Sequence, residues 1–137
     1  MPARARDLVE SALRGTPYLG RALELLDIAE RRSSDESCAI WSEHDGAVTS
    51  LALVGLVAGA RGAGRIHLLL GDDPHLVARS CDVLRAMGAR FAIAEWPDDA
   101  PFREPLRRLR EEGFAQEARI PDYFRSGVDQ VFMRRDL

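Results

Sequence analysis

The sequence predicts an α+β fold (mixed α/β) in which helices flank a central, mostly antiparallel sheet. Three observations predict this class. Apolar residues follow a helical period up to about residue 32 and then form strand-like runs. Glycine and proline signals separate these runs. The resulting order of elements is ααβββαβαββ, and because no repeat or linker interrupts the 137 residues, one domain is predicted over 1–137.

The first two predicted elements are amphipathic helices. Apolar residues share one face over 5–14, and Gly15 is placed to end this helix. Thr16 and Pro17 are typical of a helix N-cap and first turn, so a second helix is predicted from there to about residue 32. The polar stretch 33–35 then breaks the helical pattern.

Three antiparallel strands are predicted next, over 37–43, 47–58 and 65–70. Asp45-Gly46 favours a hairpin turn between the first two strands, because both residues tolerate positive φ. The glycine-rich stretch 59–64 is interpreted as the second turn. It does not suit a phosphate-binding loop, because it precedes a strand and does not open a helix.

Helices and strands alternate in the second half of the chain. Asp73 is the predicted N-cap of a helix over 73–88, and a strand follows over 91–96. Because a helix joins this strand to the preceding one, the two are expected to be parallel neighbours. The remaining predicted elements are a helix over 99–113 and two strands over 114–120 and 128–134.

Composition excludes several classes of function. A net charge of −3 offers no basic surface for nucleic acid. The most apolar stretch, 51–60, is too short to cross a membrane, and the charged first 14 residues contain no signal-peptide core. Cys38 and Cys81 match no redox or zinc spacing, so reduced thiols and a cytoplasmic protein are expected. All 19 basic residues are arginine, which leaves no lysine for a Schiff base.

The end of the chain carries the most specific pattern. Gly113-Phe114, then Ala-Arg-Ile-Pro-Asp-Tyr-Phe over 118–124, then Gly-Val-Asp over 127–129, is similar to the closing signature of many bacterial acetyltransferases. Two further stretches, 16–27 and 88–95, resemble the same subgroup. The chain therefore resembles the GNAT acyltransferase superfamily over nearly its whole length, with the first edge strand missing.

This resemblance implies transfer of an acetyl group from acetyl-CoA to a small-molecule or peptide amine. In the superfamily two central strands splay apart and the pantetheine arm of acetyl-CoA enters the gap. These strands would be 65–70 and 91–96 here. Leu69, Leu70 and Gly71 are then the candidate cofactor-binding residues, because they lie nearest the expected opening and a backbone N–H there could polarise the thioester carbonyl.

Several positions depart from the superfamily pattern. The loop that binds the CoA pyrophosphate is replaced by Gly-Asp-Asp-Pro-His over 71–75, where two carboxylates would repel phosphate and the proline removes a donor. Leu109 stands where the family has its general-acid tyrosine, and Phe102 where it has an asparagine. Tyr123-Phe124 inverts the commoner Phe-Tyr order.

Glu95 and Tyr123 are the candidate catalytic residues that the resemblance supplies. Glu95 could accept a proton from the amine, and its alternative role is an ion pair with an arginine at the rim of the sheet. No metal is predicted, because His67, Asp72, Asp73 and His75 fit a strand histidine and an ordinary helix start better than a ligand set. A core or edge role is favoured for each of four aromatic residues, and a place in the cleft walls is the alternative that their positions allow; they are Tyr18, Trp41, Trp96 and Tyr123.

Two functions therefore remain open at this point. One is a divergent N-acetyltransferase that still binds acyl-CoA, mainly through its pantetheine arm. The other is a non-catalytic GNAT-like module that binds another ligand or a protein in the old cleft. A homodimer fits either function, since the missing first strand would leave the strand at 37–43 as an open edge.

Overall fold

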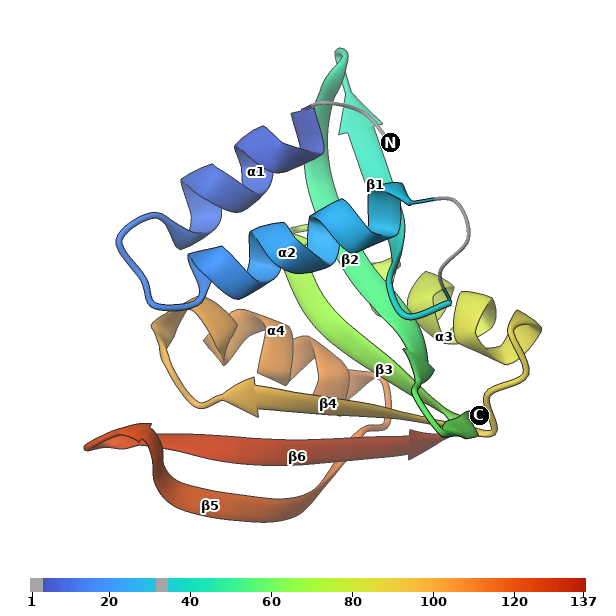
Figure 1. The fold of residues 1–137 in the computed structure, drawn as a ribbon, viewed down its shortest axis with the longest axis vertical. Helices are drawn as coiled ribbons and strands as arrows, with labels where there is room; N and C mark the ends of the chain where they lie inside the picture. The colour runs from blue at the N-terminus through green and yellow to red at the C-terminus, as the bar shows by residue number, and fades with distance from the viewer. Residues whose placement is uncertain (1–3, 32–34) are drawn as a thin grey trace.

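The computed structural model describes residues 4–31 and 35–137. The predicted order ααβββαβαββ is confirmed, and the strands form one mixed six-stranded sheet in the order β1-β2-β3-β4-β6-β5. In Figure 1, α1 and α2 lie in front of this sheet and α3 and α4 lie behind it. The elements are α1 (Arg4–Leu13), α2 (Leu19–Glu30), β1 (Cys38–His44), β2 (Ala47–Val57), β3 (Ala60–Gly71), α3 (Leu76–Ala86), β4 (Phe91–Pro97), α4 (Ala100–Glu111), β5 (Ala115–Arg125) and β6 (Val128–Asp136).

The core lies on both faces of the central strands. Seven consecutive residues of β2, from Ser50 to Leu56, are buried, because helices cover this strand from both sides. The buried faces of α3 and α4 include the apolar positions that the sequence predicts, among them Cys81, Leu106 and Leu109. None of the helices in the described residues combines the length and hydropathy that a membrane crossing requires.

The prediction of a long turn over 59–64 is wrong, because β3 already begins at Ala60. The reversal is completed by Ala58 and Gly59, the latter with φ of 77°. Glycine suits the strand itself for a packing reason. A Cβ at Gly62 would meet the Arg90 side chain at 2.9 Å, and one at Gly64 would meet Leu84 at 2.9 Å. β3 therefore passes too close to α3 and its C-terminal turn to carry larger residues there.

Two of the predicted helix starts are also wrong by a few residues. α2 begins at Leu19, and the Thr16 hydroxyl donates to Leu13 O while it accepts from Tyr18 N–H. α3 begins at Leu76, and the Asp73 carboxylate accepts from the N–H of His75 in a turn before the helix. Residues 33 and 34 of the predicted break lie outside the described residues.

β3 and β4 are parallel neighbours, as predicted, but only over a short stretch. Their pairing ends at Arg65 and Ile93, after which the two strands separate. The register of β3 against β2 shifts between Ile66 and Leu68, which leaves His67 as the extra residue of a β-bulge. A bulge bends its strand and increases the local twist, so β3 turns away from β4 at this point.

Candidate functional site

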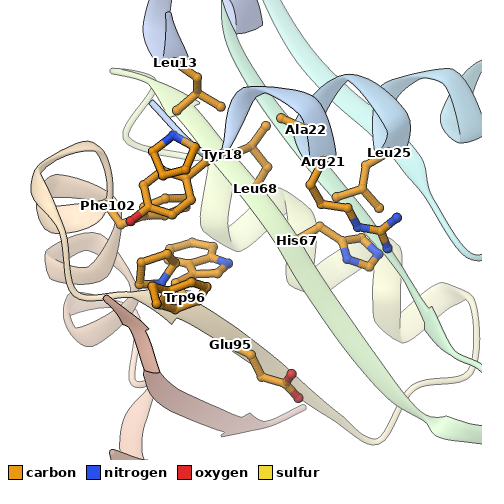
Figure 2. Close-up of a pocket in the computed structure, with 13 residues that line it drawn as sticks. Leu13, Tyr18, Arg21, Ala22, Leu25, His67, Leu68, Glu95, Trp96 and Phe102 are labelled. Atoms are coloured by element: carbon orange, nitrogen blue, oxygen red, sulfur yellow. The ribbon is translucent and has the colours of Figure 1, made fainter. Parts of the chain in front are cut away.

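A pocket of about 260 Å³ opens where β3 and β4 separate, on the side of α1 and α2. Figure 2 shows side chains from both helices, both strands and α4 converging on it. Its lining is mostly apolar. The side chains that carry charge or a titratable group are few, namely Tyr18, Arg21, His67 and Glu95.

Aromatic rings form one wall of the pocket. Tyr18 meets Phe102 edge to face with ring centroids 5.2 Å apart, and it meets Phe124 in the same way at 6.0 Å. Trp96 lies on the other side of Phe102, with centroids 5.7 Å apart. Such pairs fix ring positions and contribute about 0.5–1.5 kcal/mol each beyond the area they bury. This wall is therefore preformed.

A polar cluster ties three elements together at the rim of this wall. The Tyr18 hydroxyl donates to Asp99 Oδ2 at 2.7 Å, and Arg125 Nη2 donates to the same oxygen at 2.8 Å. The hydrogen bond from Tyr18 is the main cause that lowers the pKa of Asp99. Burial raises the pKa of Tyr18, so its hydroxyl stays protonated and remains the donor. The cluster holds the start of α2, the start of α4 and the end of β5 at fixed distances.

The bulge at His67 turns an imidazole into the pocket. Its Nε2 lies 2.8 Å from Glu36 O, and since a carbonyl can only accept, Nε2 carries the proton. Burial lowers the pKa of His67, and the nearby charges of Arg65 and Arg21 lower it further. Arg21 points toward the imidazole in Figure 2. The ring is therefore neutral at pH 7, with the lone pair of Nδ1 available as an acceptor.

Glu95 also lines the pocket, and it forms an ion pair as well. Arg65 Nη2 lies 3.4 Å from Glu95 Oε1, and about a third of each side chain is exposed. The ion pair with an arginine is therefore present, whereas the role of Glu95 as a proton acceptor stays a prediction. An ion pair this exposed contributes about 1 kcal/mol or less to stability.

The indole of Trp96 occupies the gap between the separated strands. Its Nε1 donates to Ile66 O at 2.9 Å, one residue beyond the end of the β3–β4 pairing. The side chain is fully enclosed, with 2% of Trp96 exposed. Separation of the strands would leave the carbonyl of Ile66 without a donor on β4. The indole N–H of Trp96 supplies this hydrogen bond.

The turn between β3 and α3 has its backbone donors engaged. The N–H groups of Asp72 and Asp73 both donate to the hydroxyl of buried Ser50, at 3.1 and 3.0 Å. Those of His75 and Leu76 donate to the side chain and the carbonyl of Asp73. Pro74 has no N–H. An anion at this turn would therefore meet few backbone N–H donors and the carboxylates of Asp72 and Asp73, the second of which is paired with Arg79 at 3.3 Å.

Comparison with known proteins identifies the fold. No protein-family model and no curated protein matches the sequence. Among solved structures, a GNAT-family protein from Desulfovibrio desulfuricans, described as an acetyltransferase, superposes with a TM-score of 0.80 at 21% identity, covering 96% of this chain and 89% of its own. The aminoglycoside 6′-N-acetyltransferase from Enterococcus faecium gives a TM-score of 0.77 at 11% identity, with coverages of 97% and 88%. A protein from Salmonella typhimurium, described as an acetyltransferase and solved with its cofactor acetyl-CoA, gives 0.75 at 18% identity, with coverages of 99% and 88%.

This chain has the GNAT fold. The separation of β3 and β4 is the splay that the resemblance to GNAT proteins predicts. The pocket opens beside α1 and α2, and Phe102 of α4 contributes to its lining.

On the far side of the GNAT sheet, α4 is tied directly to the β3–α3 turn. Arg108 Nη1 donates to Gly71 O at 2.6 Å. A second cavity of about 230 Å³ lies beside this contact, and acidic residues outnumber arginines in its lining. One of those arginines, Arg107, is already paired with Glu104 and Glu111. An anionic ligand would therefore meet more negative than positive charge here.

The structure separates the predicted cofactor-binding residues into two kinds. Leu69 and Leu70 are buried side chains, paired through their strand with Ala52 and Leu51. Gly71 lies at the turn with φ of 88° and accepts the hydrogen bond from Arg108. Their role in binding a cofactor stays a prediction.

The other predicted residues divide between pocket and surface. Tyr18, Glu95 and Trp96 line the pocket, whereas Tyr123 is 55% exposed on β5 and Trp41 faces a shallow depression beside Arg79. Phe124 lines the pocket and Tyr123 does not. The inverted Tyr-Phe order therefore brings the phenylalanine, and not the tyrosine, to the pocket. Within 4–31 and 35–137, no group of three or more His, Cys, Asp or Glu side chains is arranged to hold a metal ion.

Proposed function

We propose that this chain is an N-acetyltransferase-like protein of the GNAT fold that binds a small-molecule or peptide amine in the pocket beside His67 and Glu95. One observation carries the proposal. A neutral imidazole and a carboxylate line the same apolar pocket, at the point where the two central strands separate. Both groups accept hydrogen bonds, and an amine supplies donors.

His67 and Glu95 have different parts in binding. The lone pair of His67 Nδ1 accepts a hydrogen bond from the amine and orients its nitrogen, because the other ring nitrogen is fixed by Glu36 O. Glu95 attracts the charged form of the amine, and the ion pair with Arg65 weakens this attraction. Arg21 opposes a full positive charge near His67, so the neutral form of the amine suits that end of the pocket.

Acetyl-CoA is the donor that the fold implies, and the Salmonella typhimurium neighbour was solved with it. The residues of the β3–α3 turn, where the CoA pyrophosphate would bind, do not fit that group. Asp72 and Asp73 bring negative charge, their N–H groups are bound to Ser50, and Arg108 joins α4 to Gly71. We therefore derive no transfer step, and amine binding is the function that the geometry supports best.

Acetyl transfer is the second candidate function. It is favoured by the neutral His67, because an imidazole with a free lone pair could also take the proton that the amine loses during acylation. Leu109 is fully buried where the superfamily has its general-acid tyrosine, which argues for binding without transfer.

Thermal unfolding with a panel of primary amines tests the proposal. A binding amine should raise the melting temperature, by about 4 °C at roughly ten times its Kd. Glu95→Gln keeps the size of the side chain and removes its charge, so it should weaken binding with little change in the stability of the free protein. If every amine in the panel leaves the melting temperature unchanged, amine binding is wrong.

We also propose a reducing, cytoplasmic location and a homodimer for this domain. Cys81 is a buried free thiol, which supports the location. β1 is an edge strand of the described sheet, and edge strands are usually covered or paired. Pairing of β1 with a second copy would cover it.

A further inference from the structure

We infer that the pocket selects amines with an apolar, preferably aromatic, body and rejects polyhydroxylated amines such as amino sugars. The inference rests on the proposed amine binding and narrows it to a class of ligand. Three features of the pocket carry it, namely its walls, the engagement of its polar groups, and its size.

The walls offer ring faces and edges from several parts of the fold. Trp96, Phe102 and Phe124 contribute aromatic surface from β4, α4 and β5, and Tyr18 does so from the turn before α2. Leu13, Leu25 and Leu68 add aliphatic surface to the lining. A flat apolar ligand would bury its surface against these groups, and the preformed ring contacts mean that little ordering is needed on binding.

The polar groups of the pocket are largely engaged with the protein itself. The Tyr18 hydroxyl donates to Asp99, Arg21 pairs with Glu24 at 3.1 Å, and His67 Nε2 is bound to Glu36 O. Glu95 shares a carboxylate oxygen with Arg65. The acceptors that remain are one imidazole lone pair and part of a carboxylate, which suffice for an amine. On the donor side, Arg21 keeps N–H groups besides the Nη1 group that binds Glu24. Several ligand hydroxyls would stay unpaired, and each buried one would weaken binding about tenfold or more.

The size of the pocket also favours a small amine with one ring. Its volume of about 260 Å³ lies below the range of roughly 300–1,000 Å³ that drug-sized ligands occupy. An amine with a single ring fits this space, whereas an oligosaccharide would have to leave most of its rings in solvent.

Titration calorimetry with three matched small molecules tests the inference. 2-Phenylethylamine carries ring and amine, 2-phenylethanol carries the ring without the amine, and glucosamine carries an amine on a polyhydroxylated ring. We expect 2-phenylethylamine to bind at least tenfold more tightly than either of the others. Tighter binding of glucosamine overturns the inference and leaves amine binding intact. Equal binding of 2-phenylethanol overturns amine binding instead, and binding of none of the three overturns both.

Two variants on one strand locate the binding site. Phe124 and Ile120 both lie on β5 and are almost equally exposed, at 40% and 41%, but only Phe124 lines the pocket. Phe124→Ser should weaken 2-phenylethylamine binding about tenfold, whereas Ile120→Ser should leave it unchanged. Equal loss in both variants, or none in Phe124→Ser, would mean that this amine binds elsewhere.

Discussion

Replacing Trp96 by alanine should lower the free energy of unfolding by about 3–5 kcal/mol, measured by urea denaturation. The substitution removes an almost completely buried indole from the gap between β3 and β4 and the ring that lies against Phe102. It also leaves Ile66 O without its donor, which adds a desolvation cost. The effect should be large because the separated strands have no backbone pairing at this point that could compensate.

A matched variant separates the two parts of this effect. Trp96→Phe keeps an aromatic ring in the gap but cannot donate to Ile66 O, so it should cost about 1–3 kcal/mol. A loss in Trp96→Ala no larger than that in Trp96→Phe would contradict the view that the indole fills the gap by its volume.

Gly71→Ala is expected to cost about 2–5 kcal/mol of stability, also by urea denaturation. Gly71 has φ of 88°, where other residues are strained, and a Cβ there would lie 2.6 Å from Ser50 Cα and closer still to Thr49 O. The neighbours are main-chain atoms of β2, so they cannot move aside as a flexible side chain could. The same shift would disturb the hydrogen bond from Arg108.

Gly20→Ala is the control for this substitution. Gly20 lies exposed in the first turn of α2, and nothing lies within 4 Å of a Cβ built there. Alanine should stabilise the helix by up to about 0.5–1 kcal/mol. A Gly71→Ala protein as stable as Gly20→Ala would contradict the view that the close contacts and the positive φ require glycine at position 71.

Local signals in the sequence were enough to predict much of the fold. The element order, the Asp45-Gly46 turn and the start of α4 follow from residues close together in the chain. Asp99, where the predicted helix begins, is its N-cap and accepts from Ala100 N–H. The prediction of a turn over 59–64 failed for a non-local reason. Arg90 packs against Gly62 and Leu84 packs against Gly64, from 28 and 20 positions further along the chain.

The site depended more heavily on contacts between distant residues. The bulge at His67 comes from the register between β2 and β3, which no pattern within β3 reveals, so His67 was interpreted as an ordinary strand histidine. The contacts from Trp96 to Ile66 and from Arg108 to Gly71 join residues 30 and 37 positions apart. The sequence could place Glu95 beside a cleft, but it could not show what fills that cleft or which arginine pairs with it.

We propose that this GNAT fold binds an amine in its pocket while the residues around the β3–α3 turn exclude acetyl-CoA. The most direct measurement is the melting temperature of the unmodified chain with millimolar acetyl-CoA, beside a parallel sample with millimolar 2-phenylethylamine. The amine should raise the melting temperature by several degrees and acetyl-CoA should leave it unchanged. A rise with acetyl-CoA equal to that with the amine would mean that the charges of Asp72 and Asp73 and the contacts of Arg108 and Ser50 do not exclude acetyl-CoA, and the proposal would fail.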